Sequence, residues 1–380
     1  MESQTAKVAV NEHSPELERV VPAQPPKVAA AQTQALQRFT LDRPRSLNAL
    51  DNEMCLALSA AIPRVAKNPD IYIVALMSST PKVFCAGGDV VVLSATAKSD
   101  MAAAKRFLRD EYSLNWLQEC FSKPTVSFID GICMGSGAGL TAYNTHRIAG
   151  DNFKWAMPET KIGLFPDVGI ARVLAKMPWP LGLYLGLTGR SIGRADAQWL
   201  GFVTHCIASV HFDDILSRLT DAQPVDPMLD GLNEIQAPGD LQKERGHILE
   251  HFSEPTLEAI FRSLAKGEAK GSEWAARTLA SLKSCSPISL AITLRHIQAA
   301  IRLDIRETLI EDYRLAVRCL ESHDFHEGVR ALLRDKDGKP SWSTQRIEDI
   351  DTDVIESFFA PLPDGDLELP SRTEMQAARV

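Results

Sequence analysis

The stretch TVSFIDGICMGSGAGL, residues 125–140, runs from an apolar strand pattern through a glycine-rich turn into the start of a helix. Its opening, TVSFIDG, has the apolar and β-branched side chains typical of a buried strand. The glycines of MGSGAG then favour a tight turn, because glycine adopts backbone angles that other residues avoid. A strand that passes through such a turn into a helix is a repeating unit of α/β folds.

The same alternation continues on both sides of this stretch. Upstream, QRFTLDRP and IYIVALMS predict strands, and between them Leu50, Met54, Leu58 and Ile62 lie at helical spacing. IYIVALMS is a continuous apolar run, which is typical of a strand buried on both faces. The turn CAGGD and a predicted helix over 101–121 follow, and HRIAGD and KWAMPE resemble strands downstream. The pattern therefore predicts an α/β fold.

From residue 208 onward the apolar spacing is mostly helical. The predicted helices span 211–220, 241–252, 255–267, 272–283 and 287–321. The amino terminus is Pro-rich and Ala/Gln-rich, which favours a flexible segment. The predicted organisation is a flexible extension over 1–35, an α/β core with the site over 36–207, a helical region over 208–362 and a flexible tail over 363–380.

Composition excludes several classes of function. The chain has 380 residues, 45% of them hydrophobic, and a net charge of -8, so it lacks the basic face that general nucleic-acid binding needs. No apolar run reaches the ~18 residues of a membrane span. The seven cysteines are scattered without a CxxC pair, which favours reduced thiols inside a cell. Residues 1–35 match neither a secretory signal nor a transit peptide.

Two glycine-rich turns are candidates for binding a ligand. In FCAGGD, residues 84–89, Gly87 and Gly88 let the backbone approach a ligand closely. In MGSGAGL, residues 134–140, small residues open a predicted helix whose first amides lack partners within the helix. Two such turns facing one point could hold an oxyanion between two amides. Tight packing without any ligand explains either turn taken alone.

Two carboxylates stand in the apolar loop MPETKIGLFPDVG, residues 157–169. Glu159 and Asp167 lie eight residues apart there, although ionised groups near a core are costly to desolvate. Local structure offers one explanation, since Glu159 could cap the following turn and Asp167 could accept from nearby backbone amides. A shared catalytic role is the other explanation.

Four motifs together resemble one known family. They are FCAGGD, DGICMGSGAGL, AMPETKIGLFPDVG and SHDFHEGVRALLRDKDGKPSW, and the match runs in order from about residue 40 to 362. The chain resembles the crotonase superfamily and, within it, the 3-hydroxyisobutyryl-CoA hydrolases. The resemblance implies a spiral of ββα turns with a helical carboxy-terminal region. It also implies an acyl-CoA thioester substrate whose carbonyl is held between two backbone amides.

The resemblance assigns roles to individual residues. It makes Glu159 and Asp167 catalytic, and it places the oxyanion hole at the backbone N–H groups of Gly88 and Ser136. Enoyl-CoA hydratases have a second glutamate where this chain has Gly139, so the pair at 159 and 167 favours acyl transfer over hydration. Whether Glu159 attacks the carbonyl or activates a water stays open.

Further positions of the family contact the substrate. In this chain these substrate-binding positions are Gly87, Gly135, Glu111 and Arg45. A solvated helix face explains Glu111 equally well, and a free surface arginine explains Arg45. No metal site and no cofactor beyond the CoA of the substrate are expected. Four histidines lack the spacing of a metal site or triad and are predicted to be structural, namely His146, His205, His323 and His326.

Several residues depart from the family pattern. Ser136 stands within the usual glycine triplet, and Val91 replaces an arginine. Tyr143 and Asn144 replace His-Gly, while Ile170 and Arg172 fill positions that the family gives to glycine and tyrosine. Bulk beside Asp167 is expected to narrow the acyl pocket.

The main interpretation is therefore hydrolysis of 3-hydroxyisobutyryl-CoA in valine breakdown. One alternative is a catalytically silent subunit of a larger assembly such as a mitochondrial ribosome, and another is an enoyl-CoA hydratase/isomerase. By analogy with the family we expect a homo-oligomer without membrane or direct nucleic-acid partners. The same analogy implies the mitochondrial matrix for a eukaryotic protein and the cytoplasm for a bacterial one. The preferred acyl group stays open.

Overall fold

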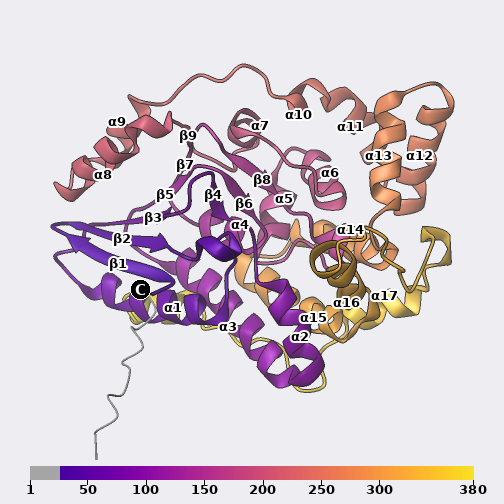
Figure 1. Cartoon of the computed structure of the whole chain (residues 1–380), viewed down its shortest axis with the longest axis horizontal. Coiled ribbons are helices and arrows are strands. Elements are labelled where there is room, and N and C mark those ends of the chain that lie inside the picture. The colour runs from indigo at the N-terminus through magenta and orange to yellow at the C-terminus, as the bar shows by residue number, and fades with distance from the viewer. Residues whose placement is uncertain (1–25) are drawn as a thin grey trace, which may run out of the picture.

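The computed structural model describes residues 26–380 and contains two sheets (Figure 1). The larger sheet has the order β1 (Val28–Thr33), β2 (Leu36–Leu41), β3 (Ile73–Ser78), β5 (Thr125–Ile129), β7 (His146–Ala149) and β9 (His205–Cys206). The smaller sheet consists of β4 (Val83–Cys85), β6 (Ile132–Met134) and β8 (Lys154–Ala156). Only β1 and β2 pair antiparallel among the described strands.

Successive strands alternate between the two sheets. The chain enters the larger sheet with β3, β5 and β7 and the smaller one with β4, β6 and β8 directly afterwards. A helix or helical turn follows each such pair, so every repeat adds one strand to both sheets. This arrangement confirms the expected spiral of ββα turns.

The turn from β5 to β6 shows why small residues set the spacing of this spiral. Gly131 has a φ of +127°, and a Cβ on it would lie 1.9 Å from the backbone carbon of Lys82. Only glycine fits this crossing. The close approach brings β6 beside β4, where Ile132 pairs with Val83.

The helices of the first half pack around the sheets. They are α1 (Asn52–Lys67), α2 (Val90–Ser99), α3 (Met101–Cys120), α4 (Ser136–Ala142), α5 (Ile170–Lys176), α6 (Leu181–Thr188) and α7 (Arg194–Trp199), with 3-10 turns η1 (Pro44–Ser46) and η2 (Glu159–Ile162). The helix predicted over 101–121 is α3, whose start is capped when the Asp100 side chain accepts the amide of Ala103. Its buried face includes Glu111 and Tyr112.

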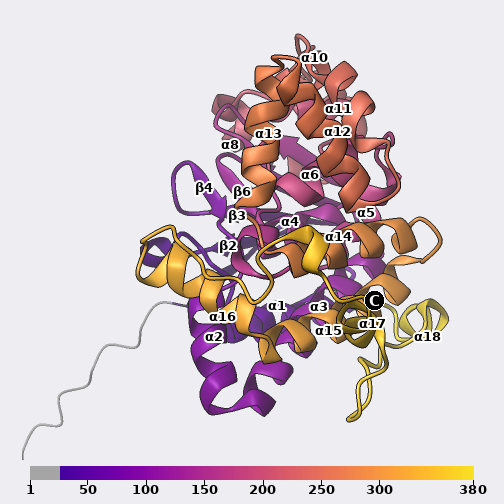
Figure 2. The same cartoon turned by 90° about the vertical axis from the view of Figure 1, so that its right-hand side faces the viewer.

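The second half is helical, as the pattern predicts. Its elements are η3 (Ser209–His211), α8 (Phe212–Thr220), α9 (Val225–Asp230), α10 (Asp240–Lys243), α11 (Arg245–Phe252), α12 (Leu257–Ala269), α13 (Glu273–Lys283), α14 (Pro287–Ala300), α15 (Ile305–Glu321), α16 (His323–Val329), the π-helical η4 (Arg330–Arg334), η5 (Ile347–Asp349), α17 (Thr352–Phe359) and α18 (Arg372–Ala377). Helices α10 to α13 gather at one end of the molecule, opposite α2 (Figure 2).

The single helix predicted over 287–321 is wrong, because two helices occupy this range. α14 ends at Ala300 and α15 begins at Ile305. Asp304 and Glu307 form a capping box, in which each side chain accepts the backbone amide of the other residue. This local signal starts a new helix and turns the chain.

Both predicted terminal segments need correction. Residues 1–25 lie outside the described residues, but Val28–Thr33 is strand β1, paired with β2 from Val28 opposite Leu41. The predicted tail over 363–380 contains α18, with Met375 buried. The indole of Trp116 in α3 donates to the Pro370 carbonyl at 2.9 Å, which holds this tail against the core. None of the helices within 26–380 is both long and apolar enough to cross a membrane.

The carboxy-terminal region packs directly on the loop that carries Glu159. A Cβ on Gly163, whose φ is +71°, would lie 2.3 Å from the backbone of Asp324 in α16. A Cβ on Gly328 would lie 2.5 Å from the backbone of Ile162. Both glycines therefore permit a backbone contact between α16 and η2 that any side chain would push apart.

This contact predicts a stability effect for Gly328→Ala. The added methyl overlaps packed backbone, so the free energy of unfolding should fall by about 1–3 kcal/mol. Gly246→Ala in α11 is the matched control, since nothing lies within 4 Å of a Cβ there, and alanine should leave that helix equally stable or slightly more stable. Thermal and denaturant unfolding measure both variants. Equal stability of the two would contradict the close packing of α16 on η2.

Candidate active site

Three segments reach the site from adjacent strands of the smaller sheet. β4 leads into the turn with Gly87 and Gly88, β6 leads into Gly135 and Ser136, and β8 leads into η2 with Glu159. Because the three strands are parallel, their carboxyl ends meet at one edge of the sheet. Crevices at the carboxyl ends of parallel strands are the usual ligand sites of open α/β sheets.

The two glycine-rich turns lie against each other. A Cβ on Gly135 would lie 3.2 Å from the Cα of Gly87 and 4.0 Å from the amide nitrogen of Gly88. Gly87 has a φ of +117° and Gly135 a φ of +49°, where a side chain would be strained. Glycine at these positions therefore serves both the backbone angles and the close approach.

The amides of Gly88 and Ser136 are free to bind a ligand. Leu50 bridges this turn by donating to the Gly87 carbonyl at 2.8 Å and accepting the Asp89 amide at 2.9 Å, so the intervening Gly88 amide faces away from Leu50. Ser136 is the first residue of α4, whose N-cap residue, a glycine, makes no side-chain cap. Neither amide has an acceptor within residues 26–380.

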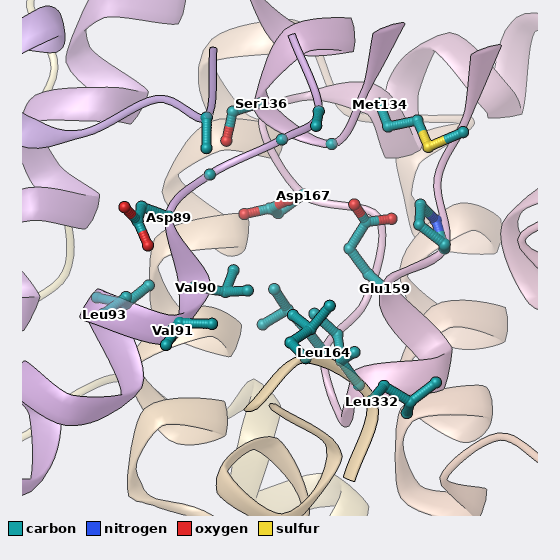
Figure 3. Close-up of a pocket in the computed structure, with 18 of the residues that line it drawn as sticks. Asp89, Val90, Val91, Leu93, Met134, Ser136, Glu159, Leu164, Asp167 and Leu332 are labelled. Carbon is teal, nitrogen blue, oxygen red and sulfur yellow. The ribbon is translucent and has the colours of Figure 1, made fainter. Parts of the chain in front are cut away.

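These groups open into a pocket of about 660 Å³, within the range of ligand sites. Figure 3 shows Ser136, Asp167 and Glu159 around its inner end, with apolar residues such as Val90, Val91 and Leu164 along its sides. Every predicted site residue lines this pocket, namely Glu159, Asp167, Gly88, Ser136, Glu111, Gly87, Gly135 and Arg45. The fold thus brings together all the positions that the resemblance assigned.

Glu159 is buried at the inner end of the pocket. Its Oε1 would lie 2.9 Å from a Cβ on Gly135, and its Oε2 has no hydrogen-bond partner among the described residues. Burial, followed by the charge of Asp167, raises the pKa of Glu159 well above its ordinary value. The alternative explanation as a cap is wrong, because η2 has Pro158 as its N-cap residue and no side-chain cap.

Asp167 is held by a tyrosine from α3. The hydroxyl of Tyr112 donates to Asp167 Oδ2 at 2.7 Å, and both side chains are buried. Burial is the main reason that the pKa of Asp167 is raised, and the charges of Glu111 and Asp312 add to it. The bond from Tyr112 and the backbone amide of Asp167 itself act in the opposite direction.

Sequence reasoning did not identify Tyr112. Adjacent residues on a helix do not face each other, so its place beside Glu111 carried no signal for a shared site. A lone tyrosine among the apolar positions of a helix is typical of a core residue.

Glu111 is buried rather than part of a solvated face. Only 3% of it is exposed, and its Oε1 has no partner among the described residues. Burial raises the pKa of Glu111 to about 7, while a hydrogen bond with the side chain of Ser136 lowers it. Because groups buried without a partner are rare, the free oxygens of Glu111 and Glu159 mark where a polar ligand would bind.

Basic residues stand at the mouth of the pocket. Arg45 in η1 is exposed there. Lys161 in η2 and Lys336 after η4 line the same pocket, although the sequence analysis did not identify them. Lysines in polar loops such as RDKDGK are common on surfaces, so only the fold shows that they face one cavity.

Two departures from the family pattern lie outside the pocket. Ile170 is fully buried and Arg172 donates to the carbonyls of Ala300 and Ile301 at 2.8 and 2.9 Å. Neither residue lines the pocket, so the expected narrowing by these two residues is wrong. The reason is that α5 begins at Ile170 and leads the chain away from the site.

Gly139 leaves no space for a second glutamate. A Cβ there would lie 2.7 Å from the Cβ of Val168 and 3.2 Å from the Asn115 side chain. A carboxylate at this position would need the loop around Asp167 to move.

The predicted structural histidines have partners outside the pocket. His146 contacts Asp226 at 2.9 Å and His205 contacts Asp230 at 3.2 Å. His326 contacts the Ser94 hydroxyl and His323 the carbonyl of Ser341. Within residues 26–380 there is no cluster of three or more His, Cys, Asp or Glu side chains suited to a metal ion.

Comparison with known proteins gives a consistent result. The mitochondrial 3-hydroxyisobutyryl-CoA hydrolase of Xenopus tropicalis is 37% identical over 341 residues, which cover 87% of this chain and 88% of that protein. The probable 3-hydroxyisobutyryl-CoA hydrolase 3 of Arabidopsis thaliana is 33% identical over 372 residues, 93% of this chain and 98% of that protein.

Two solved structures are also similar, each with a TM-score of 0.83. One is a carnitinyl-CoA dehydratase from Mycobacterium thermoresistibile, 32% identical and covering 89% of this chain and 98% of its own. The other is an enoyl-CoA hydratase from Rhodobacter sphaeroides, which is 34% identical and covers 90% of this chain and 100% of its own. A family model described as enoyl-CoA hydratase/isomerase matches residues 36–359. The chain therefore belongs to the enoyl-CoA hydratase/isomerase family, in the group that contains the 3-hydroxyisobutyryl-CoA hydrolases.

Proposed function

We propose that this protein hydrolyses 3-hydroxyisobutyryl-CoA to 3-hydroxyisobutyrate and CoA, as the names of its relatives from Xenopus and Arabidopsis indicate for those proteins. The observation that carries this proposal is the pair of free amides at Gly88 and Ser136, which open into the same pocket as the carboxyl groups of Glu159 and Asp167. This set of groups fits acyl transfer.

The two amides would stabilise the charge that develops on the thioester oxygen. Attack on the carbonyl gives a tetrahedral oxyanion, and a single preorganised donor of this kind is typically worth about 10²–10³ in rate. Gly88 and Ser136 come from neighbouring turns of adjacent strands, so their spacing is set by the sheet and needs no rearrangement when the substrate binds.

Glu159 would start the reaction from beside this oxyanion hole. Its carboxylate either attacks the carbonyl, with CoA leaving as thiolate and water hydrolysing the resulting anhydride, or takes a proton from the attacking water. Asp167 would orient that water or exchange a proton with Glu159, since neighbouring carboxyl groups separate each other's pKa values. The proposed steps use side chains, backbone amides and water, with no metal or cofactor.

The rest of the pocket fits the two ends of the substrate. The free carboxyl oxygen of Glu111 would accept the hydroxyl of the acyl group, because it is buried without a partner. Arg45, Lys161 and Lys336 at the mouth would meet the phosphates of CoA.

Hydration is the weaker alternative, although two similar structures are named as a dehydratase and a hydratase. Val168 fills the space that a glutamate at position 139 would need. A silent structural subunit is also disfavoured, because buried carboxyl groups without partners are costly and serve no purpose in a scaffold.

The names of the relatives support a proposal for the cellular setting. Several vertebrate relatives are named as mitochondrial, which supports the matrix for a eukaryotic protein and a role in valine breakdown. For a bacterial protein the cytoplasm is the corresponding location. A homo-oligomer stays a prediction from the family.

The first prediction for the active site concerns Glu159→Gln. The change keeps the size of the side chain but removes its charge, so thioester cleavage should fall about 100-fold or more, with CoA binding nearly unchanged. Because burial raises the pKa of Glu159, the variant should be at least as stable as the wild type at neutral pH, and thermal unfolding checks that lost activity is not lost folding. Thiol release and calorimetric CoA binding are the measurements. Activity above a tenth of the wild type would assign the chemistry to another group.

The second prediction concerns reaction type. Purified protein should release CoA from 3-hydroxyisobutyryl-CoA without measurable hydration of crotonyl-CoA. Gly139→Glu should gain no hydratase activity, because its Cβ would overlap Val168. Thiol release and loss of crotonyl absorbance follow the two reactions in parallel. Hydration as fast as hydrolysis would overturn the assignment.

The third prediction concerns Ser136. Its side chain lowers the pKa of the neighbouring Glu111 carboxyl, and the family resemblance assigns the oxyanion to backbone donors, so its amide alone is expected to serve the oxyanion. Ser136→Gly and Ser136→Ala should both keep kcat within a few-fold. A loss of about tenfold or more in both variants, with folding intact, would instead make the hydroxyl a catalytic donor. Steady-state kinetics together with circular dichroism distinguish the outcomes.

A further inference from the structure

The turn that presents Asp167 has unusual backbone angles. Val168 has a φ of +51° and Gly169, which follows it, a φ of +75°. Branched side chains avoid positive φ, so Val168 is a true outlier that the surrounding structure must hold. Such strain is informative because it lies directly beside a carboxylate of the pocket.

Two side chains from outside the pocket hold this turn. The hydroxyl of Tyr143, which directly follows α4, donates to the Val168 carbonyl at 2.9 Å. The Gly169 amide donates to Asp312 Oδ2 of α15 at 2.6 Å. A Cβ on Gly169 would lie 1.8 Å from the Tyr143 hydroxyl, so the tyrosine packs directly on the turn.

A histidine, His296, offsets the free-energy cost of burying the Asp312 carboxylate. Asp312 is fully buried, and its Oδ1 lies 2.6 Å from Nε2 of His296, which is itself 1% exposed. Burial lowers the pKa of His296, but Asp312 and the nearby Glu311 outweigh it and raise that pKa to about 9. The pair shares one proton and has no net charge whichever residue holds it, which limits the cost of burial.

We propose that Tyr143 and Asp312 are positioning residues that hold the strained turn so that Asp167 meets Tyr112 inside the pocket, with His296 balancing Asp312. Neither Tyr143 nor Asp312 lines the pocket, so both act through Asp167. The inference rests on the proposed function for the role of Asp167 and extends it to residues that the substrate does not touch.

Kinetics test the proposal with three variants. Tyr143→Phe removes one hydroxyl, and Asp312→Ala removes the acceptor, whereas Asp312→Asn keeps an oxygen for the Gly169 amide. We expect kcat to fall about threefold or more in Tyr143→Phe and about tenfold or more in Asp312→Ala, with KM within about twofold, because misplacing a reacting group slows the chemical step. Asp312→Asn should recover most of the rate.

The Asp167→Asn background separates positioning from a general effect on folding. If the anchors act through Asp167, each change should alter kcat less than about twofold once Asp167 is replaced. A fall in kcat by the same factor in both backgrounds would overturn the proposal. A wild-type kcat in both Tyr143→Phe and Asp312→Ala would also overturn it.

Hydrogen exchange gives a readout that does not depend on activity. Peptides that cover residues 163–175 should exchange faster in Tyr143→Phe and Asp312→Ala than in the wild type. The matched control is Asp196→Ala, because buried Asp196 accepts the amides of Leu241 and Gln242 at 3.1 Å and does not line the pocket. It should speed exchange near 241 and leave both 163–175 and kcat unchanged.

The two readouts also distinguish failure of this inference from failure of the proposed function. A wild type that releases no CoA from any acyl-CoA tested would refute the proposed function. Hydrogen exchange would still test whether Tyr143 and Asp312 hold the turn. Unchanged exchange over 163–175 in both variants would overturn the inference even if the wild type hydrolyses its substrate. If Asp312→Ala does not fold, the kinetics and the hydrogen exchange of Tyr143→Phe alone test the proposal.

Discussion

The site depends on the alignment of three short parallel strands. β4, β6 and β8 end at one edge of the smaller sheet, and each leads directly into a segment of the pocket. Sheet pairing fixes the distance between neighbouring strands to about 4.8 Å, so the two turns with Gly88 and Ser136 must lie side by side. Glycine lets these turns touch without side chains between them. The spacing of the two amide donors is thus a property of the sheet.

Burial of acidic groups is the second constraint. Glu111, Glu159 and Asp167 are all buried, at 3%, 6% and 7% exposed, and line one pocket. Burial raises the pKa of all three, so protonated carboxyl groups persist there at higher pH than in water. Such a set can both accept and donate protons, which hydrolysis of a thioester requires. Burying three carboxyl groups costs free energy, which a protein without that chemistry could avoid by placing apolar residues there.

The carboxy-terminal helices support the loop that carries Glu159 and Asp167. α16 lies on η2 through backbone contacts at Gly163 and Gly328. α15 provides Asp312, which accepts the Gly169 amide beside Asp167. The helical region therefore supports the loop with both carboxylates from two sides, rather than only covering the α/β part.

The sequence by itself determined the α/β alternation and, through its resemblance to a known family, the spiral fold and the catalytic and substrate-binding positions, because strand patterns, glycine turns and colinear motifs are local properties. The break at Asp304 was missed, although its capping box lies within four residues and is a local signal. Strand β1 was missed because its alanines gain strand structure only by pairing with β2. Tyr112 and Asp312 acquired their places only through tertiary structure. Each lies close to a site residue in space through helix packing, and helix packing brings together residues far apart in the chain that no local pattern connects.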